Sequence, residues 1–126
     1  MSSSCPFCDV PDRRVLDSNE LALVIRDAYP VAPGHTLVIS RRHIASFFQL
    51  GCTEQAAMFS LLLRAQTVLQ QEFEPDGYNI GINDGEAAGQ TVGHVHLHLI
   101  PRRKSDVVDP RGGIRWVLPE KARYWE

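Results

Sequence analysis

Residues 94–100 read HVHLHLI and place three of the chain's five histidines at every second position. In a β-strand successive side chains point to opposite faces, so His94, His96 and His98 share one face and the apolar residues between them share the other. On a helix the same spacing would scatter the imidazoles around the axis. We therefore predict a strand with one face in the core and a row of imidazoles on the other.

Two kinds of chemistry suit such a row of imidazoles. Neutral imidazoles are common metal ligands, but alternate strand residues lie about 6.6 Å apart, so convergence of all three on one ion needs favourable rotamers. Alternatively, one imidazole attacks phosphorus as a nucleophile, since an unperturbed histidine is mostly neutral near pH 7 and offers a lone pair. At this point both interpretations stay open beside a merely solvated strand face.

The loop before the row, DGEAAGQTVG, favours a phosphate-bearing ligand. Gly85, Gly89 and Gly93 allow the backbone to approach a ligand closely and to point N–H groups at it. Gln90 and Thr91 add an amide and a hydroxyl. A hairpin connection can have a similar composition, so the indication comes from the position of the loop directly upstream of the histidines.

The cysteines indicate a second site. Cys5 and Cys8 have the C-x-x-C spacing of a zinc knuckle, which needs two further ligands such as His43 and His94. A reduced structural pair or a redox dithiol would fit the same spacing. Cys52 is expected to be a small buried residue at the start of a helix.

Three polar residues at the ends of expected strands could reach a pocket. His35 begins one strand, Asp27 ends another and Asn83 ends a third. Taken alone, each fits a hydrogen-bonded strand end as well as a ligand contact.

The periodicity of apolar residues predicts the elements that position these side chains. A helix is expected from an N-cap at Thr53 to about Phe73, because apolar residues recur there at helical spacing. Alternating residues predict further strands over residues 21–27, 35–40 and 78–83. The sequence thus indicates an α+β fold in which an antiparallel sheet is backed by one long helix. Residues 1–20 are expected to form a loop or metal-tied knuckle, and the tail 102–126 is left without an assigned structure.

Bulk properties narrow the class of protein. The 126 residues suit a single domain, and a net charge of −2 argues against a non-specific nucleic-acid binder. The N-terminus lacks the apolar stretch of a signal peptide and no run reaches transmembrane length, so a cytoplasmic protein without a membrane partner is expected. In that compartment three cysteines are not expected to form a disulfide framework.

The stretch GQTVGHVHLHLIP resembles the signature of the histidine-triad (HIT) family, His-φ-His-φ-His-φ-φ, in which φ is apolar. PVAPGHTLVISRRHI, NDGEAAGQTV and the early C-x-x-C pair are similar to other parts of that family. The resemblance runs from about Cys5 to Arg103. It implies protomers that pair into a homodimer with one continuous antiparallel sheet.

The resemblance also implies a nucleotide hydrolase or transferase that acts at the α-phosphate of an adenine nucleotide. His96 would be the nucleophile, His98 would contact and neutralise the phosphate, and His94 would support the nucleophile. In members with C-x-x-C, His94 would also bind zinc together with Cys5, Cys8 and His43. His35 would lie next to the triad, Asp27 would hold the ribose hydroxyls, and Asn83 would bond near the scissile bridge. Gly89, Gln90 and Thr91 would sit around the phosphate. Leu21, Leu23 and Ile25 would wall the base pocket.

The branch of the family is left open. Dinucleoside polyphosphate hydrolases and nucleoside phosphoramidases share the triad, whereas the chain is too short for the galactose-1-phosphate uridylyltransferase branch. It also lacks the extra zinc finger and basic character of the DNA-deadenylating branch. Two alternatives to this chemistry are a metal-dependent hydrolase with the triad as ligands and a catalytically silent nucleotide-binding protein.

Overall fold

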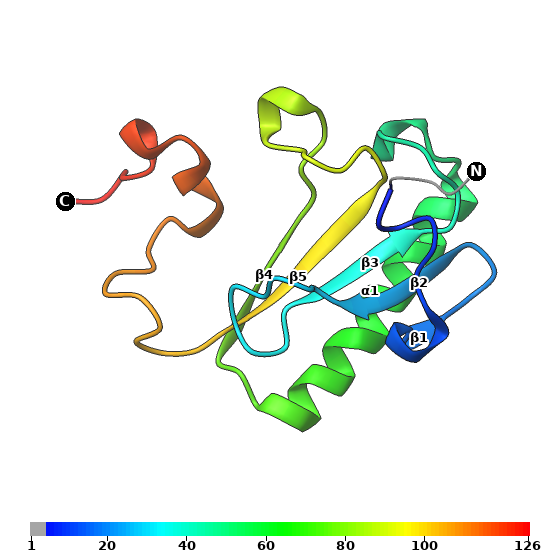
Figure 1. Ribbon diagram of the computed structural model, residues 1–126. Coiled ribbons are helices and arrows are strands. Elements are labelled where there is room, and N and C mark those ends of the chain that lie inside the picture. Colours follow the sequence, from blue (N-terminus) through cyan, green and yellow to red (C-terminus); the bar gives the residue numbers. More distant parts are fainter. Residues whose placement is uncertain (1–4) are drawn as a thin grey trace.

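A computed structural model describes residues 5–126, and in it one antiparallel sheet is backed by one long helix (Figure 1). The strands pair in the order β1-β2-β3-β5-β4, and every neighbouring pair is antiparallel. The predicted α+β class is therefore confirmed. The strands are β1 (Asp17–Ser18), β2 (Ala22–Arg26), β3 (Thr36–Ser40), β4 (Gly77–Gly81) and β5 (His96–Arg102), and the helix is α1 (Cys52–Phe73). The short 3₁₀ turns are η1 (Asp12–Arg14), η2 (Phe47–Gln49), η3 (Glu86–Ala88), η4 (Gly113–Val117) and η5 (Pro119–Lys121).

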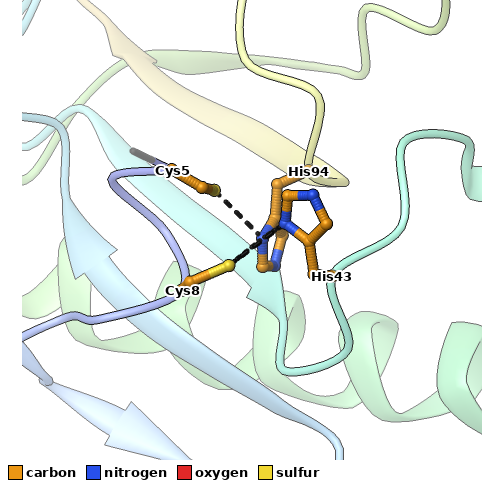
Figure 2. Close-up of side chains that lie close together, drawn as sticks. All are labelled: Cys5, Cys8, His43 and His94. Carbon is orange, nitrogen blue, oxygen red and sulfur yellow. Dashed lines mark hydrogen bonds between the residues drawn. The ribbon is translucent and has the colours of Figure 1, made fainter. Parts of the chain in front are cut away.

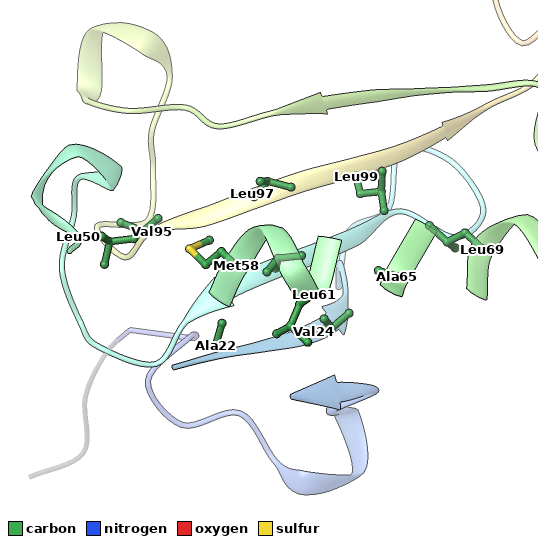
Figure 3. Close-up of a cluster of buried hydrophobic side chains, with 11 residues drawn as sticks. Ala22, Val24, Leu50, Met58, Leu61, Ala65, Leu69, Val95, Leu97 and Leu99 are labelled. Atoms are coloured by element: carbon green, nitrogen blue, oxygen red, sulfur yellow. The ribbon is translucent and has the colours of Figure 1, made fainter. Parts of the chain in front are cut away.

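The main core lies between α1 and one face of the sheet (Figure 3). The helix buries one residue on each successive turn, because apolar residues at intervals of three or four share one face. From the sheet, Val95, Leu97 and Leu99 point into the same core, as the alternation in residues 94–100 predicts. The buried helix residues are Met58, Leu61, Ala65 and Leu69.

Every predicted helix and strand differs from the structure at one or both ends, and β2 and β3 leave Asp27 and His35 just outside them. Helix α1 is capped by Gly51, not Thr53, and the backbone N–H of Gly51 donates to the Glu54 carboxylate at 3.0 Å. Cys52 is exposed, so its predicted burial is wrong: it lies on the first turn, outside the buried face of the helix. Strand β4 ends at Gly81, two residues early, and β5 begins at His96, which leaves His94 just before the strand.

The opposite face of the sheet is covered by the N-terminal segment instead of a helix. Phe7, Val10 and Val15 pack there against a second buried cluster formed by β2 and β3. Its members Leu37 and Ile39 are the register partners of His98 and His96. The face that carries the histidines therefore lies under the segment that carries the C-x-x-C pair. The second cluster consists of Leu23, Ile25, Leu37 and Ile39.

The C-terminal segment that follows β5 is held together by its own arginines and aromatic rings. The Arg111 guanidinium lies 4.6 Å from the centre of the Trp125 ring, and Arg115 donates to the backbone carbonyls of Lys121 and Ala122. Figure 1 shows this segment, orange to red, beside the β4 edge of the sheet. No helix within residues 5–126 is both long enough and apolar enough to span a bilayer.

Candidate functional site

The three histidines lie as the alternation predicts, on the face of the sheet opposite α1. His94 and His96 are buried and His98 is half-buried, and the rings of His96 and His98 lie 5.1 Å apart. The register of β5 with β3 places this row beside apolar side chains that exclude water. His96 and His98 therefore have the apolar side chains of β3 beside them.

The hydrogen bond of His96 determines which of its nitrogens is free. Its Nδ1 lies 2.8 Å from the backbone carbonyl oxygen of His94, and because a carbonyl can only accept, Nδ1 carries the proton and donates it. In the neutral ring Nε2 then carries the lone pair. His96 lines a cleft, so this nitrogen is suited to attack an electrophile bound there.

A second chain of hydrogen bonds determines the tautomer of His98. The backbone N–H of Val31 donates to Nδ1 of His35 at 3.1 Å, so neutral His35 carries its proton on Nε2. That Nε2 lies 2.9 Å from Nδ1 of His98 and donates to it, while the Asp27 carboxylate lies 3.4 Å away. Neutral His98 therefore carries its own proton on Nε2, as a donor for a phosphoryl oxygen.

Burial keeps these two imidazoles neutral near pH 7. It lowers the pKa of His98 from 6.5 to about 4, and the neighbouring rings of His96 and His35 act in the same direction. Burial also lowers the pKa of His35, although the nearby Asp27 carboxylate opposes that shift. The hydrogen bonds derived above for neutral His35 and His98 are therefore the ones present near pH 7.

The low pKa of His98 predicts an acid-sensitive fold. Between pH 6.5 and about 4 the unfolded chain takes up a proton at this residue and the folded chain does not. The contribution to the free energy of unfolding is thus complete above pH 6.5 and is lost as the pH falls through this range. We expect a loss of about 1–2 kcal/mol, reduced by the partial solvent exposure of the ring. Urea unfolding of the wild type and of His98→Gln at about pH 7 and about pH 4.5 measures it. An identical pH dependence in the two proteins would contradict this assignment.

The same hydrogen bonds determine whether the nitrogen atoms at the triad can coordinate a metal ion. Ligand atoms of Asp27, His35 and His98 lie within 4.8 Å of one another, a spacing that could hold a metal ion. However, Nε2 of His35 carries a proton as long as its Nδ1 accepts from Val31, and a protonated nitrogen cannot coordinate. His94 turns its Nε2 to the Ser40 carbonyl oxygen at 2.6 Å, away from the other two triad rings. The bonding of the triad thus favours acid–base and nucleophilic chemistry over metal ligation.

The glycine-rich loop closes one side of the cleft. Gly85 and Gly89 have φ angles of 97° and 96°, which glycine adopts without steric cost. The Gln90 side chain braces this loop, because its amide donates to the carbonyls of Ala45 and Val92 and accepts from the backbone N–H of Gly85. These hydrogen bonds hold the loop in its conformation without a ligand contact.

The cleft has a volume of about 380 Å³, within the range of small-ligand sites. It brings together the five residues proposed for the ribose, the scissile bridge and the phosphate, and three of the four proposed catalytic histidines; the fourth, His94, does not line it. Phe7, Arg14 and Leu37 also line it, and the sequence analysis missed them. Leu21, Leu23 and Ile25 were expected at the base pocket but are not among the lining residues. The proposed site residues that line the cleft are Asp27, His35, Asn83, Gly89, Gln90, Thr91, His96 and His98.

The four predicted zinc ligands lie together beside the N-terminal end of β5 (Figure 2). Nδ1 of His94 is 3.4 Å from Sγ of Cys5 and 3.7 Å from Sγ of Cys8. Nδ1 of His43 is 3.1 Å from Sγ of Cys8 and 3.2 Å from Nδ1 of His94. Zinc bonds of about 2.0 Å to nitrogen and 2.3 Å to sulfur place tetrahedral ligands about 3.3–3.8 Å apart. The four distances, from 3.1 to 3.7 Å, are close to this range, and all four ligand atoms lie within 4.8 Å of one another, so the cluster is compatible with zinc.

The chemistry of His94 also suits a metal ligand. Its Nε2–H donates to the Ser40 carbonyl, so Nδ1 keeps its lone pair and faces the two sulfur atoms. Burial lowers the pKa of His94, which keeps the ring neutral and able to coordinate. A backbone carbonyl that orients a ligating imidazole in this way is typical of zinc sites.

Comparisons with known proteins agree with this geometry. The model of the HIT domain matches residues 9–105. The chain is 38% identical over 105 residues to the uncharacterized HIT-like protein MG132 of Mycoplasma genitalium, which covers 80% of this chain and 74% of that protein. It is 39% identical over 93 residues to the asymmetrical bis(5'-nucleosyl)-tetraphosphatase of Schizosaccharomyces pombe, which covers 74% of this chain and 51% of that protein. A crystal structure of a zinc-bound histidine triad family protein from Mycobacterium smegmatis has a TM-score of 0.73 at 38% identity and covers 84% of this chain and 80% of that one.

Proposed function

Because the chain belongs to the HIT family, which includes dinucleoside polyphosphate hydrolases, we propose that it cleaves an adenine nucleotide at the α-phosphorus through a nucleotidyl-histidine intermediate. The substrate is a dinucleoside polyphosphate or a nucleoside phosphoramidate. The observation that carries the proposal is the bond from Nδ1 of His96 to the His94 carbonyl, which leaves a lone pair on Nε2.

In the first step Nε2 of His96 forms a bond to phosphorus, and the bond from phosphorus to the bridging oxygen or nitrogen breaks. The leaving group departs with that electron pair and takes a proton from solvent. The ring that carries the nucleotide is positively charged, and its Nδ1–H still donates to the His94 carbonyl, which stabilises that charge. Water then attacks phosphorus and gives up a proton to solvent, the N–P bond breaks, and its electron pair returns to Nε2 as the nucleoside monophosphate leaves.

The other proposed residues bind and orient the nucleotide. His98 donates from Nε2 to a phosphoryl oxygen, where charge develops in the transition state. The backbone N–H groups of Gly89 and Gln90 donate to the carbonyls of Glu86 and Gly85, so their part is to hold the loop beside the phosphate. Asp27 binds the ribose hydroxyls and Asn83 lies near the scissile bridge. His35 acts through His98, because its Nε2–H maintains the tautomer of that ring.

Cys5, Cys8, His43 and His94 would hold one zinc ion with a structural role. When bound, the ion would tie the N-terminal segment to the sheet, and no step of the reaction passes through it. The zinc-bound relative from Mycobacterium smegmatis supports this assignment.

A homodimer and a cytoplasmic location complete the proposal. Strand β4 lies at the edge of the sheet, and its residue Ile80 is 48% exposed. Pairing of two β4 edges would satisfy their backbone groups and cover this side chain. Sedimentation equilibrium should then give twice the 14.1 kDa mass of the chain.

A panel of substrates tests the function. Purified protein is assayed side by side on dinucleoside tri- and tetraphosphates and on adenosine 5'-phosphoramidates, in water enriched in oxygen-18. We expect one class to be turned over at least tenfold faster, with the heavy oxygen in the nucleoside monophosphate and a quenched adduct on His96. Absence of turnover on every substrate, with nucleotide binding intact, would favour the silent binding protein instead. Activity that follows a metal ion bound at the triad, in addition to the zinc at Cys5, Cys8, His43 and His94, would favour the metal-dependent hydrolase.

A further inference from the structure

The Cys/His cluster and the nucleophile are joined by Phe7. This residue lies between Cys5 and Cys8 in the sequence, so the position of its ring depends on the turn that the two cysteines form. The ring centre lies 4.8 Å from that of His96 and 6.0 Å from that of His94, at interplanar angles of 57° and 88°. Such tilted and edge-on contacts between rings are attractive and depend on orientation.

The same ring forms part of the ligand cleft. Pro6 and Phe7 line it at the end where the N-terminal segment crosses the sheet. Beneath the segment, Phe7 packs on the buried cluster of β2 and β3 together with Val10. Movement of the C-x-x-C turn would therefore change the wall of the cleft and release one face of His96.

A second connection passes through His94. Its Nδ1 belongs to the Cys/His cluster, and its backbone carbonyl accepts the Nδ1–H of His96. One residue thus belongs both to the set of four ligand atoms and to the hydrogen bond that orients the nucleophile. One connection to His96 comes from the N-terminal segment, and the other comes from the residues just before β5.

From this arrangement we infer that Phe7 is a positioning residue through which zinc at Cys5, Cys8, His43 and His94 orders both His96 and the nucleotide cleft. The inference rests on the zinc site and the nucleotide cleft proposed above. With zinc bound, the turn is fixed and the Phe7 ring stays against the His96 ring. Zinc and nucleotide then stabilise the same arrangement, so each raises the affinity of the chain for the other by an equal factor.

The experiment measures this mutual effect without relying on activity. The zinc affinity of the full chain is determined by competition with a chromophoric chelator, with and without saturating AMP. For the wild type we expect AMP to tighten zinc binding about tenfold. Phe7→Ala should still bind one zinc per chain, because all four ligands remain, but the effect of AMP should fall to less than about twofold.

Two further variants separate positioning from packing. Val10→Ala removes an apolar side chain of the same segment that packs on the same cluster and is absent from the lining of the cleft, so it should keep the full AMP effect. Phe7→Leu keeps most of the apolar volume but lacks the ring, and it takes the place of Phe7→Ala if that variant folds poorly. The effect of AMP on its zinc affinity should lie between those of the wild type and Phe7→Ala. In imidazole ¹⁵N spectra, removal of zinc should shift the His96 resonances of the wild type, and Phe7→Ala should show shifted resonances even with zinc bound.

Each result decides between the linked proposals. An unchanged zinc affinity in the presence of AMP, with both ligands bound by the wild type, would overturn the coupling and leave the zinc site and the function standing. A full AMP effect in Phe7→Ala would overturn the role of Phe7. Failure of the chain to bind zinc, or to bind AMP, would overturn the coupling together with the zinc site or the nucleotide cleft, respectively.

Discussion

His96→Ala is expected to lower kcat by about 10⁴-fold or more while the affinity for AMP changes less than about threefold. Nucleophile removal has effects of this size in enzymes that form covalent intermediates, because water must then attack without the two-step route. AMP binding is retained because the glycine-rich loop, His98 and Asp27, which is proposed for the ribose, stay in place. Steady-state kinetics with the preferred substrate and calorimetric titration with AMP measure the two quantities.

A conservative replacement sharpens this test. His96→Gln keeps a polar side chain of similar length but offers no ring nitrogen, so it should be as inactive as His96→Ala. Val68→Ala, on the exposed face of α1, serves as a control and should leave kcat within about twofold. Full turnover by either His96 variant, or a quenched adduct on another residue, would contradict the assignment of the nucleophile.

Disruption of the Cys/His cluster should have the second large effect, on stability. We expect Cys8→Ser to reduce zinc content to well below one per chain and the free energy of unfolding by about 3 kcal/mol, or roughly 10 °C in Tm. The physical reason is that the ligands tie residues 5–8 to His43 and His94, which are far apart in sequence. Calorimetry and zinc analysis of the purified variant measure both changes.

Cys52→Ser is the matched control for this prediction. Its thiol is exposed on the first turn of α1 and lies outside the four-residue cluster. The substitution should change Tm by less than about 2 °C and should leave the zinc content unaltered. Equal effects of Cys8→Ser and Cys52→Ser would argue that the cluster holds no structural metal.

The local periodicity of the sequence determined most of the fold. A period of two placed Val95, Leu97 and Leu99 in the core and the histidines on the other face, because this alternation follows from strand geometry alone. A period of 3.6 likewise located α1. The start of the helix was misplaced because a cap depends on local backbone angles, and Gly51 adopts the extended conformation that Thr53 was expected to have.

The chemical meaning of the site depended on contacts between distant parts of the chain. The spacing of the histidines indicated a nucleophile or a metal site, and it could not choose between them. Two backbone groups favour the nucleophile: the Val31 N–H bonded to His35 and the His94 carbonyl bonded to His96. The sequence carries no signal for such bonds, because every residue except proline has the same backbone groups.

The composition of the sequence by itself determined which residues could do chemistry, and the tertiary structure decided which of them lie together. Cys5 and Cys8 needed two partners, and folding brought His43 and His94 to them across 35 to 89 residues of chain. Phe7 acquired its place against His96 in the same way. Residue type and short-range periodicity are properties of neighbours in the chain, whereas tautomers, ligand sets and ring contacts depend on distances in space that only the packed sheet sets.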